Sequence, residues 1–171
     1  MTNIGRRATD TSDKALQFEP IGKWIWLLPL AYASHVMEEA YGGHGLIGWM
    51  NDRGGIHLSM AAFLGLNLVG VAIIAAATWG ARMHRLWQWP LASAGTILFM
   101  NGLSHVAASI VTRHYVSGMW TGIAIYLPLG AFILLRVQHR VRPLVFRAAI
   151  AVGFAIHAAV LWWVVFGAPG F

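Results

Sequence analysis

The chain has 171 residues, of which 58% are hydrophobic and 11% charged, and its formal net charge is +6. Soluble domains carry about 25% charged residues, so this composition indicates an integral membrane protein with one compact domain. Its basic residues fall between apolar segments, where they set topology, and we therefore expect no nucleic-acid partner. The absence of cysteine excludes disulfides, thiolate nucleophiles, cysteine-bound zinc and c-type haem attachment.

A polar N-terminal tail over residues 1–22 precedes a predicted transmembrane domain over residues 23–171. Apolar segments in this domain each approach the ~20 residues that cross a bilayer. Tryptophans lie at many of their ends, as expected where aromatic rings meet lipid head groups. The sequence thus predicts an all-α bundle of five transmembrane helices, at Trp24–Tyr41, His57–Trp79, Trp89–Val111, Gly118–Leu135 and Leu144–Phe166.

The orientation follows from the positions of the basic residues. With the N-terminus inside, ten basic residues would be cytoplasmic, and the outer loops would hold only Arg53 and Arg113. We therefore place the N-terminus in the cytoplasm and the C-terminus outside. A signal peptide cleaved near Ala31-Tyr32-Ala33 is a weaker alternative, because three acids occur in the long stretch before it.

Prolines and glycines modify the predicted helices. Pro29 and Pro128 should kink the first and fourth segments, because proline lacks the N–H that a helix needs. Gly118 and Gly122 have the spacing that lets membrane helices approach closely. We interpret this spacing as ordinary helix packing.

The first apolar segment contains the motif His35-Val36-Met37-Glu38-Glu39. A carboxylate at membrane depth costs about 2–3 kcal/mol or more, so such residues usually mark a functional site. His35, Glu38 and Glu39 fall within an arc of ~100° on a helix. The alternative is a structural role, in which a nearby histidine merely neutralises the acids.

Other apolar segments bring polar residues to a similar depth. The third segment has Asn101 and His105 one turn apart, and the fifth has His157. This shared depth favours one site built from several helices. Asn67 is expected to pack, and the remaining histidines at 44, 84, 114 and 139 should be solvated.

Histidine and carboxylate ligands without thiolates suit zinc, iron(II) or manganese. The predicted metal ligands are His35, one of Glu38 and Glu39, and His105, with His157 as a further candidate. The other glutamate would act as general base, and Asn101 would orient the substrate. Without a metal, a buried glutamate could itself exchange protons with a substrate.

The HxxEE motif followed by Asn101-Gly102-Leu103-Ser104-His105 resembles the HXXEE family of small bacterial integral membrane proteins. The likeness extends from the first apolar segment to about the fourth. It implies a protein of the bacterial cytoplasmic membrane with an active site on these motifs. It implies no particular substrate.

The leading hypothesis is a membrane-embedded, metal-dependent enzyme that acts on a lipidic or apolar substrate in the outer half of the bilayer. Hydrolysis, hydroxylation and isomerisation all remain open. The alternatives are a transporter component that moves protons or metal ions, and a redox protein that binds haem or quinone. A homodimer would suit the transporter.

Residues 42–56 form either a lid over the site or a plain interfacial loop.

Overall fold

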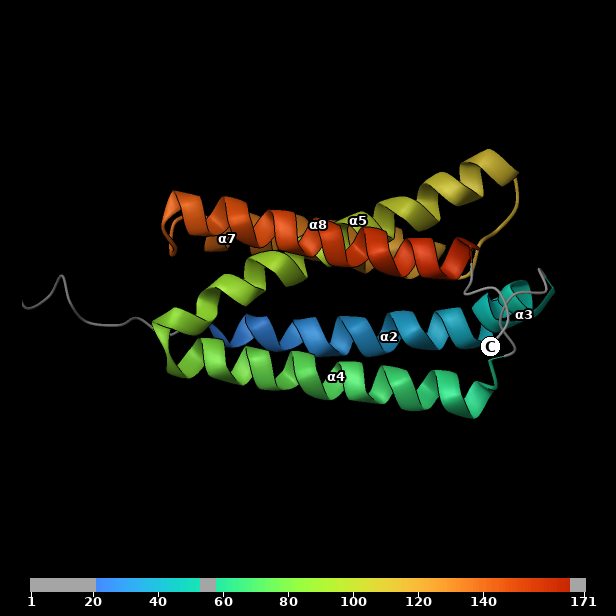
Figure 1. Ribbon diagram of the computed structural model, residues 1–171, viewed down its shortest axis with the longest axis horizontal. Coiled ribbons are helices and arrows are strands. Elements are labelled where there is room, and N and C mark those ends of the chain that lie inside the picture. Colours follow the sequence, from blue (N-terminus) through green and yellow to red (C-terminus); the bar gives the residue numbers. More distant parts are fainter. Residues whose placement is uncertain (1–20, 53–57, 167–171) are drawn as a thin grey trace, which may run out of the picture.

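The computed structural model describes residues 21–52 and 58–166, and all regular elements in these ranges are helical. The all-α prediction is therefore confirmed for the described part of the chain. Consecutive long helices run in opposite directions (Figure 1). In chain order the elements are η1 Lys23–Trp26, α2 Leu27–Tyr41, α3 Gly45–Asp52, α4 Met60–Met83, η2 Arg85–Gln88, α5 Trp89–Thr112, α6 Met119–Thr121, η3 Gly122–Tyr126, α7 Leu127–Val137 and α8 Pro143–Phe166.

Four helical segments are long and apolar enough to cross a membrane: Met60–Met83, Arg85–Thr112, Met119–Val137 and Pro143–Phe166. The helix with the HxxEE motif is not among them, because α2 has 15 residues. Together with the preceding 3-10 turn η1 it extends about 30 Å, which is the thickness of the hydrocarbon core. A fifth crossing and the orientation of the termini stay predictions.

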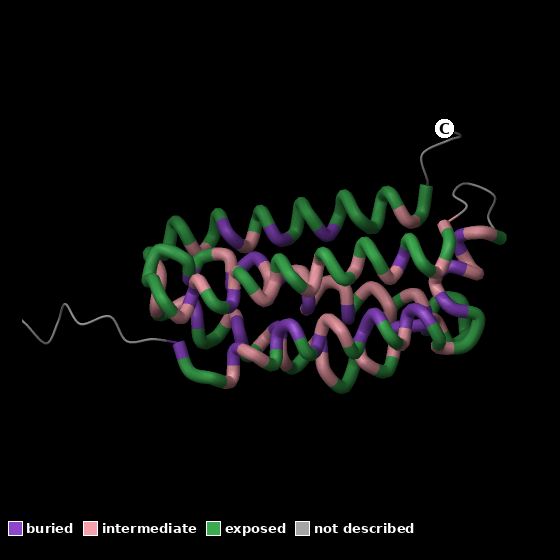
Figure 2. The backbone as a smooth tube through the Cα atoms, turned by 90° about the horizontal axis from the view of Figure 1, so that it is seen from below, coloured by how far each residue is buried: buried purple, intermediate pink, exposed green. Residues whose placement is uncertain are grey.

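The helices form two layers that α5 connects. The helix α2 packs against α4, whereas α7 and α8 both pack against α5. Figure 1 shows α5 crossing from the α2–α4 layer to the α7–α8 layer. Exposed residues run along the outer faces of the bundle (Figure 2), and many are large and apolar, as lipid-facing side chains are.

Glycines allow α5 to approach its neighbours closely. A Cβ at Gly102 would lie 3.0 Å from the carbonyl oxygen of Gly122, and one at Gly130 would lie 2.8 Å from backbone atoms of Gly95 and Phe99. Gly122 therefore serves in helix packing, as its spacing indicated. Gly118 differs, because it precedes α6 with a φ of 94°.

Pro128 coincides with a change in helix type. The five residues of η3 form a π-helix immediately before α7, and the N–H of Leu127 donates to the carbonyl oxygen of Gly122. Because Pro128 has no N–H, the α-helical pattern cannot continue through it, and the wider π-turn accommodates the break. Pro29 lies in the first turn of α2, next to the change from 3-10 to α-helix.

Two expectations concern segments that are only partly described. Most of the predicted tail, residues 1–20, lies outside the described residues, but Ile21 packs in the core with 1% exposure. The loop predicted for residues 42–56 contains the helix α3, so the expectation of a plain loop is wrong there. Its apolar residues Ile47 and Met50 are buried, which explains why this segment folds as a helix. Residues 53–57 lie outside the described ranges.

The glycine contacts predict how two alanine substitutions should differ. Gly130→Ala places a methyl group against the backbone of α5, and we expect it to lower the free energy of unfolding by about 1–3 kcal/mol. Gly65→Ala is the matched control, because nothing lies within 4 Å of its added Cβ on α4. Thermal unfolding in detergent would measure both. Equal melting temperatures for the two variants would contradict the close packing of α5 and α7.

Candidate functional site

The helix α2 directs its two adjacent glutamates to different partners. Neighbouring residues on an α-helix point about 100° apart. Glu39 lies on the buried face together with His35, which is 2% exposed, whereas Glu38 is only partly buried. The two carboxylates therefore belong to different sets of contacts.

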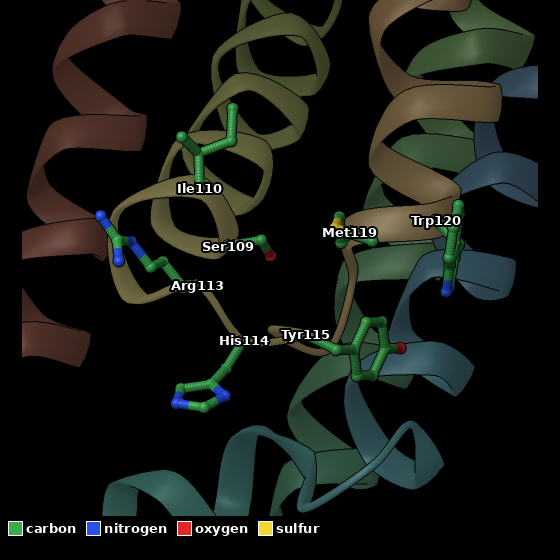
Figure 3. A pocket seen from close by; sticks show the side chains of 7 residues that line it. All are labelled: Ser109, Ile110, Arg113, His114, Tyr115, Met119 and Trp120. Atoms are coloured by element: carbon green, nitrogen blue, oxygen red, sulfur yellow. The ribbon is translucent and has the colours of Figure 1, made fainter.

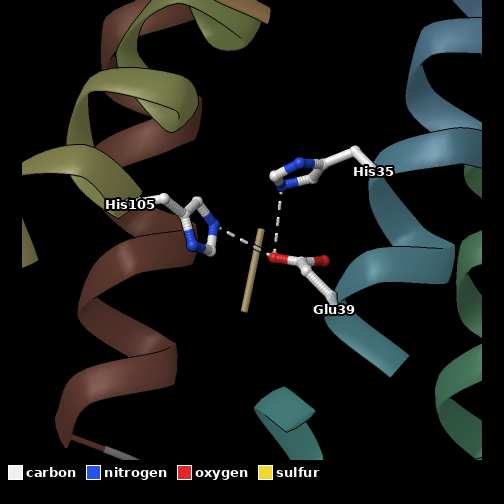
Figure 4. A group of neighbouring side chains, drawn as sticks. All are labelled: His35, Glu39 and His105. Atoms are coloured by element: carbon white, nitrogen blue, oxygen red, sulfur yellow. Dashed lines mark ion pairs between the residues drawn. The ribbon is translucent and has the colours of Figure 1, made fainter. Parts of the chain in front are cut away.

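Glu39 lies between two imidazole rings (Figure 4). Its Oε1 is 3.4 Å from the Nε2 of His35 and 3.2 Å from the Nε2 of His105 on α5. His35, Glu39 and His105 each offer a ligand atom, and these atoms lie within 4.8 Å of one another. The structure thus brings together one glutamate and two histidines that the sequence predicted to share a site.

Glu38 instead accepts hydrogen bonds from the start of the fourth apolar segment. Its Oε1 accepts from the Tyr115 hydroxyl at 2.6 Å and from the backbone N–H of Trp120 at 3.0 Å. Its Oε2 accepts from the backbone N–H of Thr121 at 2.7 Å and from the Thr121 hydroxyl at 2.5 Å. Glu38 therefore caps this helix N-terminus, where a negative charge is favourable.

Tyr115 lies outside the apolar spans and keeps its proton for this contact. Partial burial and the hydrogen bond to Glu38 raise the pKa of Tyr115 to about 12. At neutral pH the phenol is therefore a stable donor to the carboxylate.

The Thr121 hydroxyl connects Glu38 to His35. Its oxygen lies 2.7 Å from the Nδ1 of His35. A hydroxyl has one proton, and a carboxylate can only accept, so Thr121 donates to Glu38 and accepts from His35. His35 must therefore carry a proton on Nδ1. When the ring is neutral, its Nε2 has a free lone pair.

That lone pair points at a carboxylate. The Nε2 of His35 is buried and makes no hydrogen bond to any described residue. The Glu39 Oε1 at 3.4 Å is further away than the 2.7–2.9 Å typical of charge-assisted hydrogen bonds. Two acceptors that face each other repel, so this arrangement calls for a cation or a shared proton between them.

Two further residues hold the His35 ring. Tyr126, from η3, stacks on it with ring centroids 4.1 Å apart. Gly118 lies against both imidazoles, and a Cβ there would be 2.8 Å from ring atoms of His35 and His105. Thr121, Tyr115 and Tyr126 were not among the predicted site residues, although each is a polar residue in or beside an apolar segment.

Asn101 and His157 do not join this group. The Asn101 Oδ1 is buried without a hydrogen-bond partner among the described residues, one turn before His105. The Nε2 of His157, on α8, lies 3.0 Å from the Ser104 hydroxyl. Their roles as orienting residue and metal ligand stay predictions.

The remaining polar residues named from the sequence have other contacts. The Asn67 Oδ1 accepts a hydrogen bond from Tyr32, so this residue does pack between α4 and α2. His44 pairs with Asp52 at 2.7 Å on the surface. His84, His114 and His139 are exposed, as expected.

Comparison with protein families supports the resemblance that the HxxEE motif indicated. The family described as "protein of unknown function with HXXEE motif" matches residues 26–133. The chain belongs to this HXXEE-motif family. The matched segment contains the HxxEE motif, His105, Thr121 and Tyr126, and it ends before α8 and His157. Comparisons with curated proteins and with solved structures found no match.

The link through Thr121 predicts the effect of removing one hydroxyl. Thr121→Val leaves the His35 Nδ1–H without an acceptor and removes one donor from Glu38. We expect it to lower the free energy of unfolding by about 1–3 kcal/mol. Thr121→Ser retains the hydroxyl and should cost less than half as much. Chemical denaturation of the two variants would measure this, and a loss in Thr121→Ser without a loss in Thr121→Val would show that the methyl group matters instead.

Proposed function

We propose that this protein is a membrane-embedded metalloenzyme in which His35, Glu39 and His105 bind one divalent ion. The observation that carries the proposal is the buried Nε2 of His35, which has no hydrogen-bond partner among the described residues and lies 3.4 Å from the Glu39 carboxylate. A metal ion would convert this repulsive contact into two bonds. Neutral imidazole and carboxylate are the forms in which both residues bind metals.

The distances between the ligand atoms support a metal centre. Tetrahedral zinc binds nitrogen and oxygen ligands at about 2.0–2.2 Å, so adjacent ligands lie roughly 3.3–3.6 Å apart. The 3.4 Å separation between Glu39 and His35 falls in this range, and the 3.2 Å separation between Glu39 and His105 lies just below it. A haem between His35 and His105 is not favoured, because their ring centroids are 4.9 Å apart and Glu39 lies against both.

The contacts of Glu38 support a positioning role for this residue. Both of its oxygens already accept hydrogen bonds, and through Thr121 it orients His35. Such outer contacts fix the tautomer of a ligating histidine and increase its basicity. Glu38 therefore fits a residue that orients a metal ligand better than it fits a general base.

The ligand set leaves coordination positions open. Two histidines and one glutamate occur in catalytic zinc sites, where water takes the fourth position, and in non-haem iron(II) oxygenases. Zinc would support hydrolysis and iron would support hydroxylation, and manganese also accepts these ligands. The unpaired amide oxygen of Asn101 would be available to a polar group of the substrate.

The surroundings favour a lipidic or apolar substrate. The site lies between helices whose outer faces are apolar, and α2 and α5 supply its ligands. A substrate dissolved in the membrane would reach it between these helices. The positive-inside pattern would place the site in the outer half of the bilayer.

Metal analysis of the purified protein tests the proposal, and the adjacent glutamates form a matched pair. We expect about one zinc, iron or manganese ion per chain. Glu39→Gln should abolish binding, because it removes a ligand charge. Glu38→Gln should retain the ion but weaken the affinity of the site for it by about 10–100-fold, as expected when a residue that orients a ligand is changed. Elemental analysis and competition with a chelator would measure both effects.

Two other results would contradict the metal centre. Metal content that is equal in Glu39→Gln and the unchanged protein would place the ion elsewhere. Absence of metal after reconstitution with each of the three ions would favour a proton shared between Glu39 and its histidines. That is the second candidate function, because a buried carboxylate between two imidazoles also suits proton transfer.

A further inference from the structure

A surface pocket of about 350 Å³ lies where α5 ends and the chain turns toward α6. Figure 3 shows Arg113 and His114 on one side of it and Met119 and Trp120 on the other. The lining contains no acidic residue. It comprises Ser109, Ile110, Arg113, His114, Tyr115, Met119 and Trp120.

The lining combines a cation with apolar and aromatic side chains. Ile110 and Trp120 are largely exposed, although they are apolar, and they flank the pocket at the ends of membrane-length helices. Tyrosine and tryptophan favour this depth, where one end of the ring meets head groups. Arg113 has no acidic partner among the described residues. The lining thus resembles the surface that an anionic amphiphile requires.

The backbone of Arg113 supports a specific role for its side chain. It adopts φ 56° and ψ 26° at the C-cap of α5, and it is the one non-glycine residue with positive φ in the described ranges. Glycine usually occupies this left-handed position, because a side chain there costs about 1 kcal/mol or more. Within the described ranges, the other basic residues lie at the opposite ends of the helices, mostly near η2 and between α7 and α8. Topology therefore does not explain an arginine here.

The pocket shares a wall with the candidate metal site. Tyr115 and Trp120 line the pocket and also donate hydrogen bonds to Glu38. Gly118, between them in sequence, lies against both imidazole rings. A molecule in the pocket would therefore contact the segment that orients His35.

We propose that this pocket binds the anionic head group of a membrane phospholipid, with Arg113 contacting the phosphate and the acyl chains lying along Ile110 and Met119. Arginine binds phosphate through two parallel hydrogen bonds. If the proposed function holds, an anionic lipid is then the class of substrate that this site presents to the metal. Binding itself does not depend on the metal.

The Met119 methyl group offers a local probe of the pocket. We would follow its carbon-13 signal in the full-length protein in detergent, with the signal assigned from its loss in Met119→Leu. Phosphatidylglycerol should shift this signal saturably, and phosphatidylcholine with the same acyl chains should not. Arg113→Gly should weaken the phosphatidylglycerol response roughly 10- to 100-fold, and Arg113→Lys should weaken it less.

The controls separate a lost contact from a damaged protein. Glycine is the favoured residue at this backbone conformation, so Arg113→Gly should fold at least as well as the unchanged chain. Arg85→Gln removes a charge at the opposite end and should leave the Met119 response unchanged. Equal responses to the two lipids, or an unchanged response in Arg113→Gly, would overturn the proposal. Metal content measured on the same samples tests the metal centre separately, because Arg113 contacts none of its ligands.

Discussion

The Thr121 hydroxyl lies between the Glu38 carboxylate and the Nδ1 of His35, and it has a single proton to donate. Because Glu38 takes that proton, His35 must supply the next one, and the direction of both hydrogen bonds follows. This determines which nitrogen of His35 faces Glu39. The character of the site, two histidines around one carboxylate with the Nε2 of His35 turned inward, depends on this short chain of contacts.

The same contacts explain how the protein accommodates two carboxylates in a largely apolar helical bundle. An isolated charge at such depth is costly, and the usual solution is a partner for each one. Glu38 receives four hydrogen bonds, two of them from the free N–H groups of a helix terminus. Glu39 has two imidazoles. The charge of each acid is therefore stabilised by its own partners. The two adjacent residues of α2 thus make separate sets of contacts, Glu38 with a helix terminus and Glu39 with two histidines.

Much of this architecture was predictable because helix periodicity and hydropathy are local properties. The predicted segments differ from the observed helices by a few residues, with α4 starting at Met60 instead of His57. The spacing of His35 and Glu39 and the depth of His105 correctly predicted that they meet. The different tasks of Glu38 and Glu39 were not predictable, because both fall on the same broad face of α2.

The contacts that were not predicted depend on backbone geometry that the local sequence does not determine. Thr121 reaches Glu38 because the chain turns at Gly118 with positive φ, and Tyr126 reaches His35 because η3 is a π-helix. The helical course of residues 45–52 was also missed, since the glycines of this segment indicated a loop. In each case the local sequence permits several conformations, and packing against α2 or α5 selects one.

The π-turn before Pro128 also constrains how many residues this segment can contain. A single π-turn amounts to one extra residue inserted into an α-helix. In a chain lacking that residue, everything before the deletion would rotate by about 100° relative to α7. Thr121 and Tyr126 could then no longer both contact His35. Related sequences that keep the contacts of Thr121 and Tyr126 with His35 should therefore preserve the number of residues in this segment, even where its apolar side chains vary.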